Sequence, residues 1–245
     1  MSDKDASTPR VYLARHGETE WTINGRYTGT TDLPLTPNGH QQVLSTSRIL
    51  IGPNKLISPS RLAHIFISPR LRAQQTFELL FSSSEAEGKD DENGIKNRLT
   101  KEGKVTTTDA LAEWDYGAYE GLLTHEIRSG RKERGLDGER EWDIWRDGCE
   151  GGESAGQVTE RLDGLIARIR EMQGPWIHGG GRGADVLLVS HGHLLRAFAK
   201  RWLGYPLEMP LAMMMEPGAV GVLSYQHHNV EEPAFLLGMG FPAGS

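Results

Sequence analysis

The stretch Val11-Tyr12-Leu13-Ala14-Arg15-His16-Gly17 is the starting point for interpreting this chain. Its apolar part, residues 11–14, is too short for a helix and is rich in residues that favour a buried strand. The strand would end at Arg15 and His16, which places a guanidinium and an imidazole where open α/β sheets bind ligands. Gly17 allows close approach of the backbone. Taken alone, however, a structural arginine beside a capping histidine explains these residues equally well.

The same succession of strand, polar turn and helix recurs along the chain. Apolar runs predict strands at 63–67, 105–111 and 185–190, with further strands at 221–225 and near 235–237. Helical spacing predicts helices at 37–50, 70–80, 122–131, 194–203 and from 153 onward. This alternation predicts an α/β fold, a three-layer α/β/α sandwich with a mainly parallel central sheet. Parallel strands share one carboxyl edge, so Arg15, His16, Arg70, Glu113 and His191 should converge there.

Length and composition narrow the class of protein. The 245 residues fit a single domain, and a net charge of -6 argues against a general nucleic-acid or membrane-surface binder. No apolar run approaches the roughly 20 residues of a membrane helix. A single cysteine, Cys149, points to a reducing compartment, so we expect a cytoplasmic protein and leave the nucleus open. Residues 1–9 are predicted to be a flexible tail and residues 82–104 a mobile surface insertion.

The converging side chains suit phosphoryl transfer. Two guanidiniums match phosphate oxygens, a neutral imidazole can attack phosphorus, and a carboxylic acid such as Glu113 can exchange protons with the alcohol and with water. Imidazoles for a zinc site are available at His16, His191, His193, His227 and His228, but the arginines would repel a dication. At best one of His227 and His228 faces the site, and a pair of polar edge residues is an equally good interpretation. A phosphate-binding module that has lost catalysis is a third possibility, disfavoured because every catalytic role is filled.

Several motifs, in order along the chain, resemble those of the histidine phosphatase superfamily, also called phosphoglycerate mutase-like. They are Arg15-His16-Gly17-Glu18-Thr19, Tyr27-Thr28-Gly29 with Leu35-Thr36-Pro37, Ser68-Pro69-Arg70-x-Arg72-Ala73-x-x-Thr76, Leu111-x-Glu113 with Gly117 and Gly121, and His191-Gly192. The resemblance implies an α/β/α sandwich, a phosphohistidine on His16, and a phosphoryl group held by Arg15, Arg70 and His191. It also implies that Glu113 is the acid and base, and that no metal or other cofactor is used.

Within the superfamily the sequence is most similar to the fungal sedoheptulose-1,7-bisphosphatase group. That similarity implies hydrolysis of sedoheptulose 1,7-bisphosphate to sedoheptulose 7-phosphate, with fructose bisphosphates or a broad range of phosphomonoesters as alternatives. It also implies a substrate site formed by Tyr27, Thr28, Gly29, Ser68, Trp114, Tyr116, Gly192, Arg196 and His227. Mutases of the superfamily carry an arginine where this chain has Trp114, which favours a phosphatase. The expected partner is a small sugar phosphate, with no nucleic acid or membrane, and self-association is left open.

Overall fold

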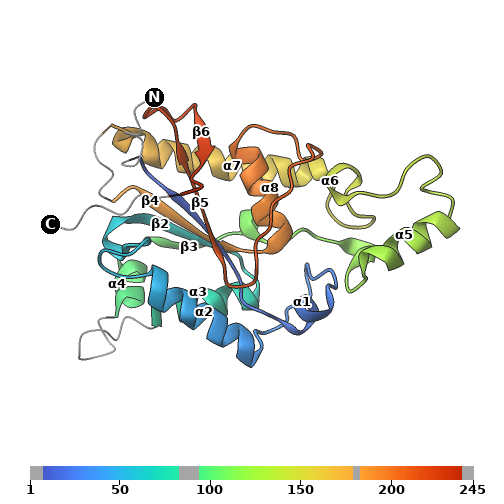
Figure 1. Ribbon diagram of the computed structural model, residues 1–245, viewed down its shortest axis with the longest axis horizontal. Coiled ribbons are helices and arrows are strands. Elements are labelled where there is room, and N and C mark those ends of the chain that lie inside the picture. Colours follow the sequence, from blue (N-terminus) through green and yellow to red (C-terminus); the bar gives the residue numbers. More distant parts are fainter. Residues whose placement is uncertain (1–7, 83–93, 179–182, 239–245) are drawn as a thin grey trace.

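The central sheet organises the molecule, which we describe from a computed structural model covering residues 8–82, 94–178 and 183–238 (Figure 1). In spatial order the strands are β3 (Val105–Thr107), β2 (Leu62–Ile67), β4 (Asp185–Ser190), β1 (Val11–Arg15), β5 (Val220–Tyr225) and β6 (Pro233–Phe235). The first four are mutually parallel. β5 runs antiparallel to β1, and β6 runs antiparallel to β5. The sheet is therefore mixed but mostly parallel, and it has one carboxyl edge shared by β1, β2, β3 and β4.

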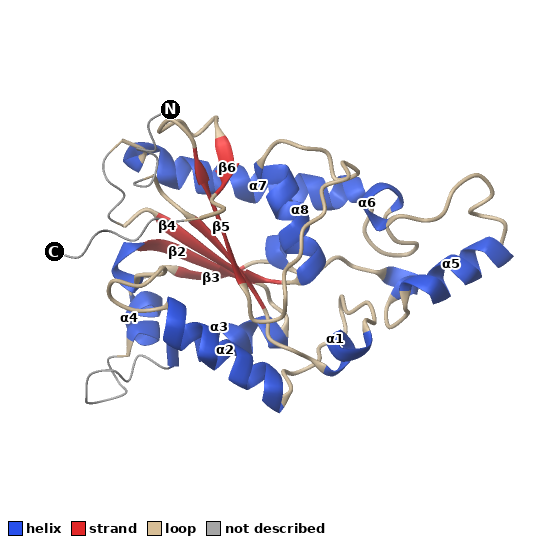
Figure 2. Ribbon diagram, in the orientation of Figure 1, coloured by secondary structure: helices blue, strands red, loops and turns tan. Residues whose placement is uncertain are grey.

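Helices cover both faces of this sheet, which gives the predicted α/β/α sandwich (Figure 2). On one face lie α2 (Pro37–Leu50), α3 (Leu71–Ser82) and α4 (Ile95–Lys101), and on the other lie α7 (Ala155–Gln173) and α8 (Gly192–Trp202). Shorter helices are α1 (Glu20–Asn24), α5 (Thr124–Glu133) and α6 (Ile144–Asp147). Among the helices of the described ranges, none is both long enough and apolar enough to cross a membrane.

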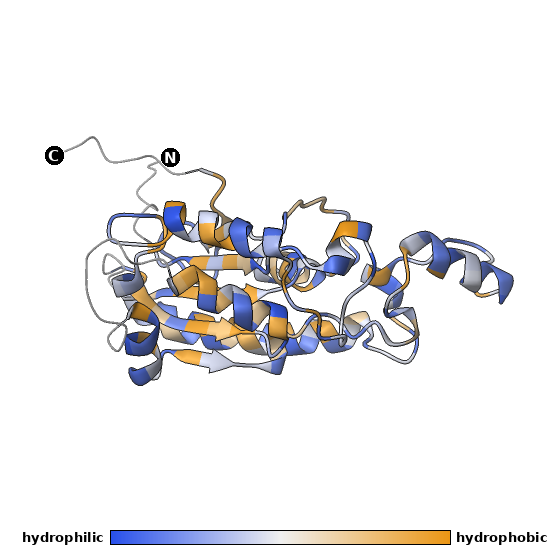
Figure 3. Ribbon diagram, turned by 90° about the horizontal axis from the view of Figure 1, so that it is seen from below, coloured by the Kyte–Doolittle hydropathy of each residue, from blue (hydrophilic) through white to orange (hydrophobic). Residues whose placement is uncertain are grey.

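Alternation along β1 divides the core into two parts. Val11 and Leu13 belong to the cluster under α7 and α8, whereas Tyr12 and Ala14 belong to the cluster under α2 and α3. Figure 3 shows the apolar residues concentrated on the strands and on the helix faces turned toward them. Burial of each large aliphatic side chain stabilises the fold by about 1.5–3 kcal/mol. Both faces of β1 are buried, so the strand end that carries Arg15 and His16 is held firmly.

Local sequence signals fix where the helices begin. Thr36 caps α2 by accepting a hydrogen bond from the Gly39 amide, and Pro37 occupies the first helical position, as predicted. Ser154 caps α7 in the same way, through the Gln157 amide. His191 is the N-cap residue of α8, which starts directly after β4. The tight passage from β4 into α8 places His191 and the first amides of that helix at the carboxyl edge.

The structure describes parts of three segments that the sequence predicts to be flexible or extended. Residues 1–7 and 83–93 lie outside the described residues; of the remainder, residues 8 and 9 precede β1 without regular secondary structure, and residues 95–101 form α4. Thr8 is buried with its hydroxyl 2.6 Å from Ser224 Oγ, and α4 buries Leu99 against the core. The strand predicted at 105–111 ends at residue 107 and is followed by a 3-10 helix, Asp109–Leu111. A hydroxyl contact thus joins Thr8 to Ser224, and an apolar contact holds α4 against the core.

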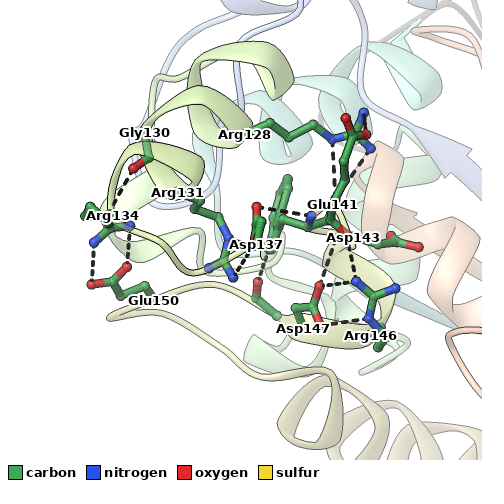
Figure 4. Close-up of polar contacts among 12 residues, drawn as sticks. Arg128, Gly130, Arg131, Arg134, Asp137, Glu141, Asp143, Arg146, Asp147 and Glu150 are labelled. Atoms are coloured by element: carbon green, nitrogen blue, oxygen red, sulfur yellow. Dashed lines mark hydrogen bonds and ion pairs between the residues drawn. The ribbon is translucent and has the colours of Figure 1, made fainter. Parts of the chain in front are cut away.

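Residues 112–153 leave the sheet as an arm that carries α5 and α6, on the right of Figure 1. Ion pairs fold this arm back on itself (Figure 4). Arg131 Nη2 lies 2.8 Å from Asp137 Oδ1, while its Nη1 donates to the Tyr119 hydroxyl. Arg134 also pairs with Glu150 at 2.8 Å. Because surface pairs contribute little individually, we assign the main role to the partly buried Arg131, which joins α5 to Tyr119 before it and to Asp137 after it.

Candidate active site

A pocket opens at the carboxyl edge, where the sequence predicted convergence. Its wall contains Arg15, His16, Thr22, Gly25, Arg26, Tyr27, Thr28, Glu113, Tyr116, Gly192, His193 and Arg196. The ring centroids of His16 and His191 are 5.1 Å apart. Residues from four separate parts of the sequence therefore line one pocket. His191 lies next to it, in contact with His16.

His16 is a buried, neutral imidazole. Its Nδ1 lies 2.7 Å from the Gly17 carbonyl oxygen, which can only accept, so Nδ1 carries the proton and Nε2 keeps its lone pair. Burial lowers the pKa of His16 well below 6.5, and the nearby guanidiniums of Arg72 and Arg15 lower it further. Gly17 is required here, since a Cβ would lie 2.6 Å from the Gly39 carbonyl oxygen. The resulting imidazole has the form that a nucleophile needs.

His191 is held from both ring nitrogens. Arg72 Nε lies 3.1 Å from His191 Nδ1, and a guanidinium can only donate, so Nδ1 is the acceptor. The remaining proton sits on Nε2 and is donated to Ser68 Oγ at 2.6 Å. Burial, followed by the charge of Arg72, lowers the pKa of His191 well below 6.5. His191 is thus fixed as a neutral ring with a defined tautomer.

Arg72 is a member of this site that our sequence analysis did not assign. It has no exposed surface, and besides His191 it donates to the carbonyl oxygens of Thr28, Gly29 and Thr31. In the structure Arg72 shares the inward face of α3 with Ala73 and Thr76. An arginine on the buried face of a helix needs a compensating polar environment. Arg72 therefore joins the loop at 28–31 to the histidine pair.

Arg15 and Arg70 carry hydrogen-bonding capacity that the protein leaves unused. Arg15 donates from Nη1 to the Met215 carbonyl oxygen, and its guanidinium lies against Gly192. The Nε atoms of Arg15 and Arg70 are buried and have no hydrogen-bond partner within the described ranges. Leaving a buried donor unpaired costs about 1–3 kcal/mol. Buried, unpaired guanidinium donors near two neutral imidazoles are suited to binding an anion such as a phosphoryl group.

Glu113 is positioned by the start of α8. Its carboxylate accepts hydrogen bonds from the amides of Trp114 and Leu194, both at 2.9 Å, and of His193 at 3.1 Å. Only 5% of its surface is exposed, and it lines the pocket together with His16. Three main-chain donors fix the carboxylate without any help from side chains. A fixed carboxyl group beside a neutral imidazole is an arrangement typical of acid–base chemistry.

Comparisons with known proteins identify the family. The model of the histidine phosphatase superfamily (branch 1) matches residues 11–234. The chain belongs to the histidine phosphatase superfamily. It is 40% identical to the sedoheptulose 1,7-bisphosphatase of Saccharomyces cerevisiae over 94% of this chain and 92% of that protein. It is 35% identical to an acid phosphatase of Mycobacterium tuberculosis, over 95% of this chain and 94% of the relative.

Solved structures agree with this assignment. The structure of an open reading frame product of Mycobacterium tuberculosis aligns with a TM-score of 0.66 and 30% identity, covering 94% of this chain and 96% of that one. A mycobacterial glucosyl-3-phosphoglycerate phosphatase, 23% identical, shares the fold with a TM-score of 0.65 over 93% of this chain and 95% of its own. This histidine phosphatase is therefore a hydrolase of phosphate esters with the phosphoglycerate mutase-like fold.

The substrate-binding residues predicted for this histidine phosphatase separate into two groups. Tyr27, Thr28, Tyr116, Gly192 and Arg196 line the pocket. The remaining four, Gly29, Ser68, Trp114 and His227, do not line it. Gly29 belongs to the loop held by Arg72, where a Cβ would come within 2.5 Å of the Trp114 carbonyl oxygen. Ser68 acts through His191, to which its hydroxyl is bonded.

The structure places two of these residues, Trp114 and His227, away from the pocket. Trp114 is fully buried, and its indole Nε1 donates to the Glu153 carbonyl oxygen, so it supports the Glu113 loop from behind. His227 follows β5, which runs antiparallel to β1 and therefore carries it to the opposite edge of the sheet. There its Nδ1 lies 2.6 Å from Glu232 Oε2. His228 follows the same strand and contacts the Ile177 carbonyl oxygen instead.

The structure also allows a search for the zinc site that was considered as an alternative from the sequence. Across residues 8–82, 94–178 and 183–238, no group of three or more His, Cys, Asp or Glu side chains is arranged to hold a metal ion. His193, one of the histidines considered as a zinc ligand, instead lines the pocket and contacts Tyr116.

The single cysteine, Cys149, is a buried free thiol. Its pKa is raised to about 12, chiefly by burial.

Proposed function

We propose that this histidine phosphatase hydrolyses a sugar bisphosphate through a phosphohistidine on His16, with no metal ion. The observation that carries the proposal is the form of His16, a buried neutral imidazole whose Nε2 forms no hydrogen bond with the described residues. It stands beside the buried, unpaired guanidinium donors of Arg15 and Arg70. Bidentate guanidiniums can both hold a phosphoryl group and stabilise the charge that builds on its oxygens during transfer.

In the first step, His16 Nε2 forms a bond to phosphorus while the bond from phosphorus to the sugar oxygen breaks. Glu113, in its protonated form, gives its proton to the departing oxygen. In the second step, Glu113 takes a proton from water as the water oxygen attacks the phosphohistidine. The bond between phosphorus and Nε2 then breaks, which regenerates His16 and releases inorganic phosphate. Arg72 keeps His191 in position throughout.

The substrate we propose is sedoheptulose 1,7-bisphosphate, which would be converted to sedoheptulose 7-phosphate. Support comes from the 40% identity to the yeast enzyme of that name and from the polar pocket wall of Tyr27, Thr28, Tyr116 and Arg196. Arg196 donates from Nε to the Gly192 carbonyl oxygen, and its guanidinium lies 5.6 Å from the Trp145 ring. These contacts fix its position and leave its other donors for a second phosphate.

A panel of phosphate esters tests the proposal. The purified protein is incubated with sedoheptulose 1,7-bisphosphate, fructose 1,6-bisphosphate, fructose 2,6-bisphosphate, 3-phosphoglycerate and phenyl phosphate, and released phosphate is measured. The expected result is the highest kcat/KM on the heptulose bisphosphate. Similar values on all esters would instead favour a broad phosphomonoesterase, which the 35% identical acid phosphatase makes the second candidate.

The nucleophile is tested separately. Rapid mixing with a substrate labelled in the transferred phosphate, followed by denaturation under alkaline conditions, should trap label on His16. A His16→Ala protein should bind the bisphosphate but release no phosphate and trap no label. Turnover by that variant would refute His16 as the nucleophile.

A further inference from the structure

His193 has a fixed position in the pocket wall. Its ring stacks on Tyr27 with a centroid distance of 5.2 Å and an interplanar angle of 24°. Trp145 meets it edge-on at 5.5 Å, and Tyr116 meets it edge-on at 5.8 Å. Aromatic contacts on several sides hold the imidazole in one orientation. The ring also lines the same pocket as His16 and Glu113.

Tyr116 and His193 form a hydrogen-bonded pair, with the Tyr116 hydroxyl 2.7 Å from His193 Nδ1. Nε2 of His193 forms no hydrogen bond with any residue of the described ranges. Burial lowers the pKa of His193 well below 6.5, and the charges of Arg196 and Arg15 lower it further. The ring is therefore neutral and has one N–H.

Either tautomer of His193 leaves the Tyr116–His193 pair with the same number of free hydrogen-bond donors and acceptors. If Tyr116 donates to Nδ1, then Nε2–H is a free donor and the phenol oxygen is a free acceptor. If Nδ1–H donates to the phenol oxygen, then Nε2 is the free acceptor and the Tyr116 O–H is the free donor. In both cases the pair presents one donor and one acceptor. A hydroxyl group both donates and accepts, so neighbouring hydroxyls on a carbon chain match this pair.

We propose that the Tyr116–His193 pair selects phosphate esters whose alcohol part carries free hydroxyl groups, with His193 as a specificity-determining residue. The inference rests on the proposed function and assigns recognition of the sugar hydroxyl groups to this pair. A pocket that hydrogen-bonds a substrate hydroxyl rejects an analogue without it, since the pocket groups are then buried unpaired. The arginines bind the phosphate groups of the substrate. The Tyr116–His193 pair would bind the hydroxyl groups on the carbon chain between the two phosphates.

The role of the side chain can be separated from that of the main chain at the same residue. The His193 amide donates to Glu113, and any substitution other than proline keeps this bond. A change in the side chain therefore leaves the main-chain support of Glu113 in place. The effect expected from losing the imidazole is a change in preference between substrates rather than an equal loss on all of them.

The test compares two bisphosphates of equal chain length. Sedoheptulose 1,7-bisphosphate carries hydroxyl groups, and heptane-1,7-diol bisphosphate carries none. The wild type should favour the sugar by at least about tenfold in kcat/KM, the equivalent of one unpaired buried group. His193→Leu should reduce that preference by about tenfold, and Tyr116→Phe should do the same. His193→Gln should recover most of it, because an amide both donates and accepts.

The control is His64→Leu, which removes a buried imidazole on β2 that bonds Thr106 and lies outside the pocket. It should leave the preference unchanged. An equal fall on both substrates in His193→Leu would overturn the inference, and so would a wild type that treats the two substrates alike. If His193→Leu does not fold, the wild-type ratio and His193→Gln decide. A wild type inactive on every sugar bisphosphate would instead overturn the proposed function.

Discussion

Arg72 Nε donates a 3.1 Å hydrogen bond to Nδ1 of His191, and this contact determines which nitrogen of the imidazole carries the proton. The same guanidinium binds three carbonyl oxygens of the loop at 28–31. One side chain therefore sets the tautomer of a histidine at the site and the shape of the adjacent loop. Arg70, two residues earlier, makes no comparable set of guanidinium contacts with the part of the chain that the structure describes.

Arg72→Lys should be far more damaging to stability than Arg70→Lys. A lysine ammonium cannot replace the planar guanidinium of Arg72, which donates to one ring nitrogen and three carbonyl oxygens. Breaking such a buried charged network costs about 3–5 kcal/mol. Arg70→Lys should change the unfolding free energy by less than about 1 kcal/mol, because Arg70 Nε is already unpaired, while still lowering kcat. Urea denaturation of both variants measures the difference. Equal destabilisation would show that Arg72 does not organise the site.

Glu113→Gln should slow both chemical steps, because an amide cannot exchange the protons. We expect kcat on the sugar bisphosphate to fall by at least about a hundredfold, the usual contribution of acid–base catalysis. With 4-nitrophenyl phosphate, whose departing oxygen needs no proton, formation of the phosphohistidine should remain faster than its hydrolysis. A burst of 4-nitrophenol followed by slow turnover is the expected record. A steady rate without a burst, equal to that of the wild type, would remove Glu113 from the proposed mechanism.

Acid should destabilise this protein through its buried histidines. Burial is the main reason that the pKa values of His16, His191 and His193 lie well below 6.5 in the folded chain. Below pH 6.5 the unfolded chain binds protons that the folded chain does not, so stability falls as the pH drops. Each histidine contributes a slope of about 1.4 kcal/mol per pH unit until its folded pKa is reached. Urea denaturation between pH 7.5 and 5 measures the slope.

His193→Gln provides the matched comparison for that pH dependence. It removes one of the three histidines, so the slope between pH 6 and 5 should decrease by about 1.4 kcal/mol per pH unit. Gly164→Ala in α7, which removes no titratable group, should leave the slope unchanged. An unaltered slope in His193→Gln would mean that this imidazole is protonated in the folded state.

Gly192→Ala should lower activity without a large loss of stability. A Cβ at this position would lie 3.2 Å from Cζ and Nε of Arg15, so the guanidinium must shift. We expect kcat/KM to fall by about tenfold or more, the scale of a misplaced transition-state donor. The control is Gly164→Ala in α7, which has open space and should stabilise the helix by about 0.5–1 kcal/mol. Full activity in Gly192→Ala would show that the position of Arg15 tolerates displacement.

The fold could be predicted from the sequence wherever the signal was local. The apolar runs of β1 and β4 and the Thr36-Pro37 helix start specify their own elements, and the structure confirms them. Parallel order then brought Arg15, His16, Glu113 and His191 together, because strands of one direction end at one edge. The convergence of these residues therefore followed from topology alone.

The remaining differences depend on information that is not local. The direction of β5 is set by its pairing with β1, and that pairing moved His227 to the far edge. From the sequence, an aromatic residue next to Glu113 is as consistent with a position in the substrate pocket as with one in the core. Only the packing of the folded chain shows that Trp114 is buried. Arg70 precedes α3 and Arg72 lies in its first turn, so whether Arg72 faces inward depends on where the helix begins. Helical phase near a helix start is hard to fix from sequence.

The reversal of β5 also constrains the length of the chain that precedes it. After α8 the polypeptide must return to the carboxyl edge before β5 begins, and on that path the Met215 carbonyl oxygen meets Arg15 while the Gly218 amide meets the His16 carbonyl oxygen. Met215 and Gly218, which take no part in the reaction, thereby help to position Arg15 and His16. Insertions or deletions close to Met215 should alter turnover, because they would displace the carbonyl oxygen that Arg15 contacts. The activity of this histidine phosphatase thus depends on the length of a connection that lies outside its catalytic residues.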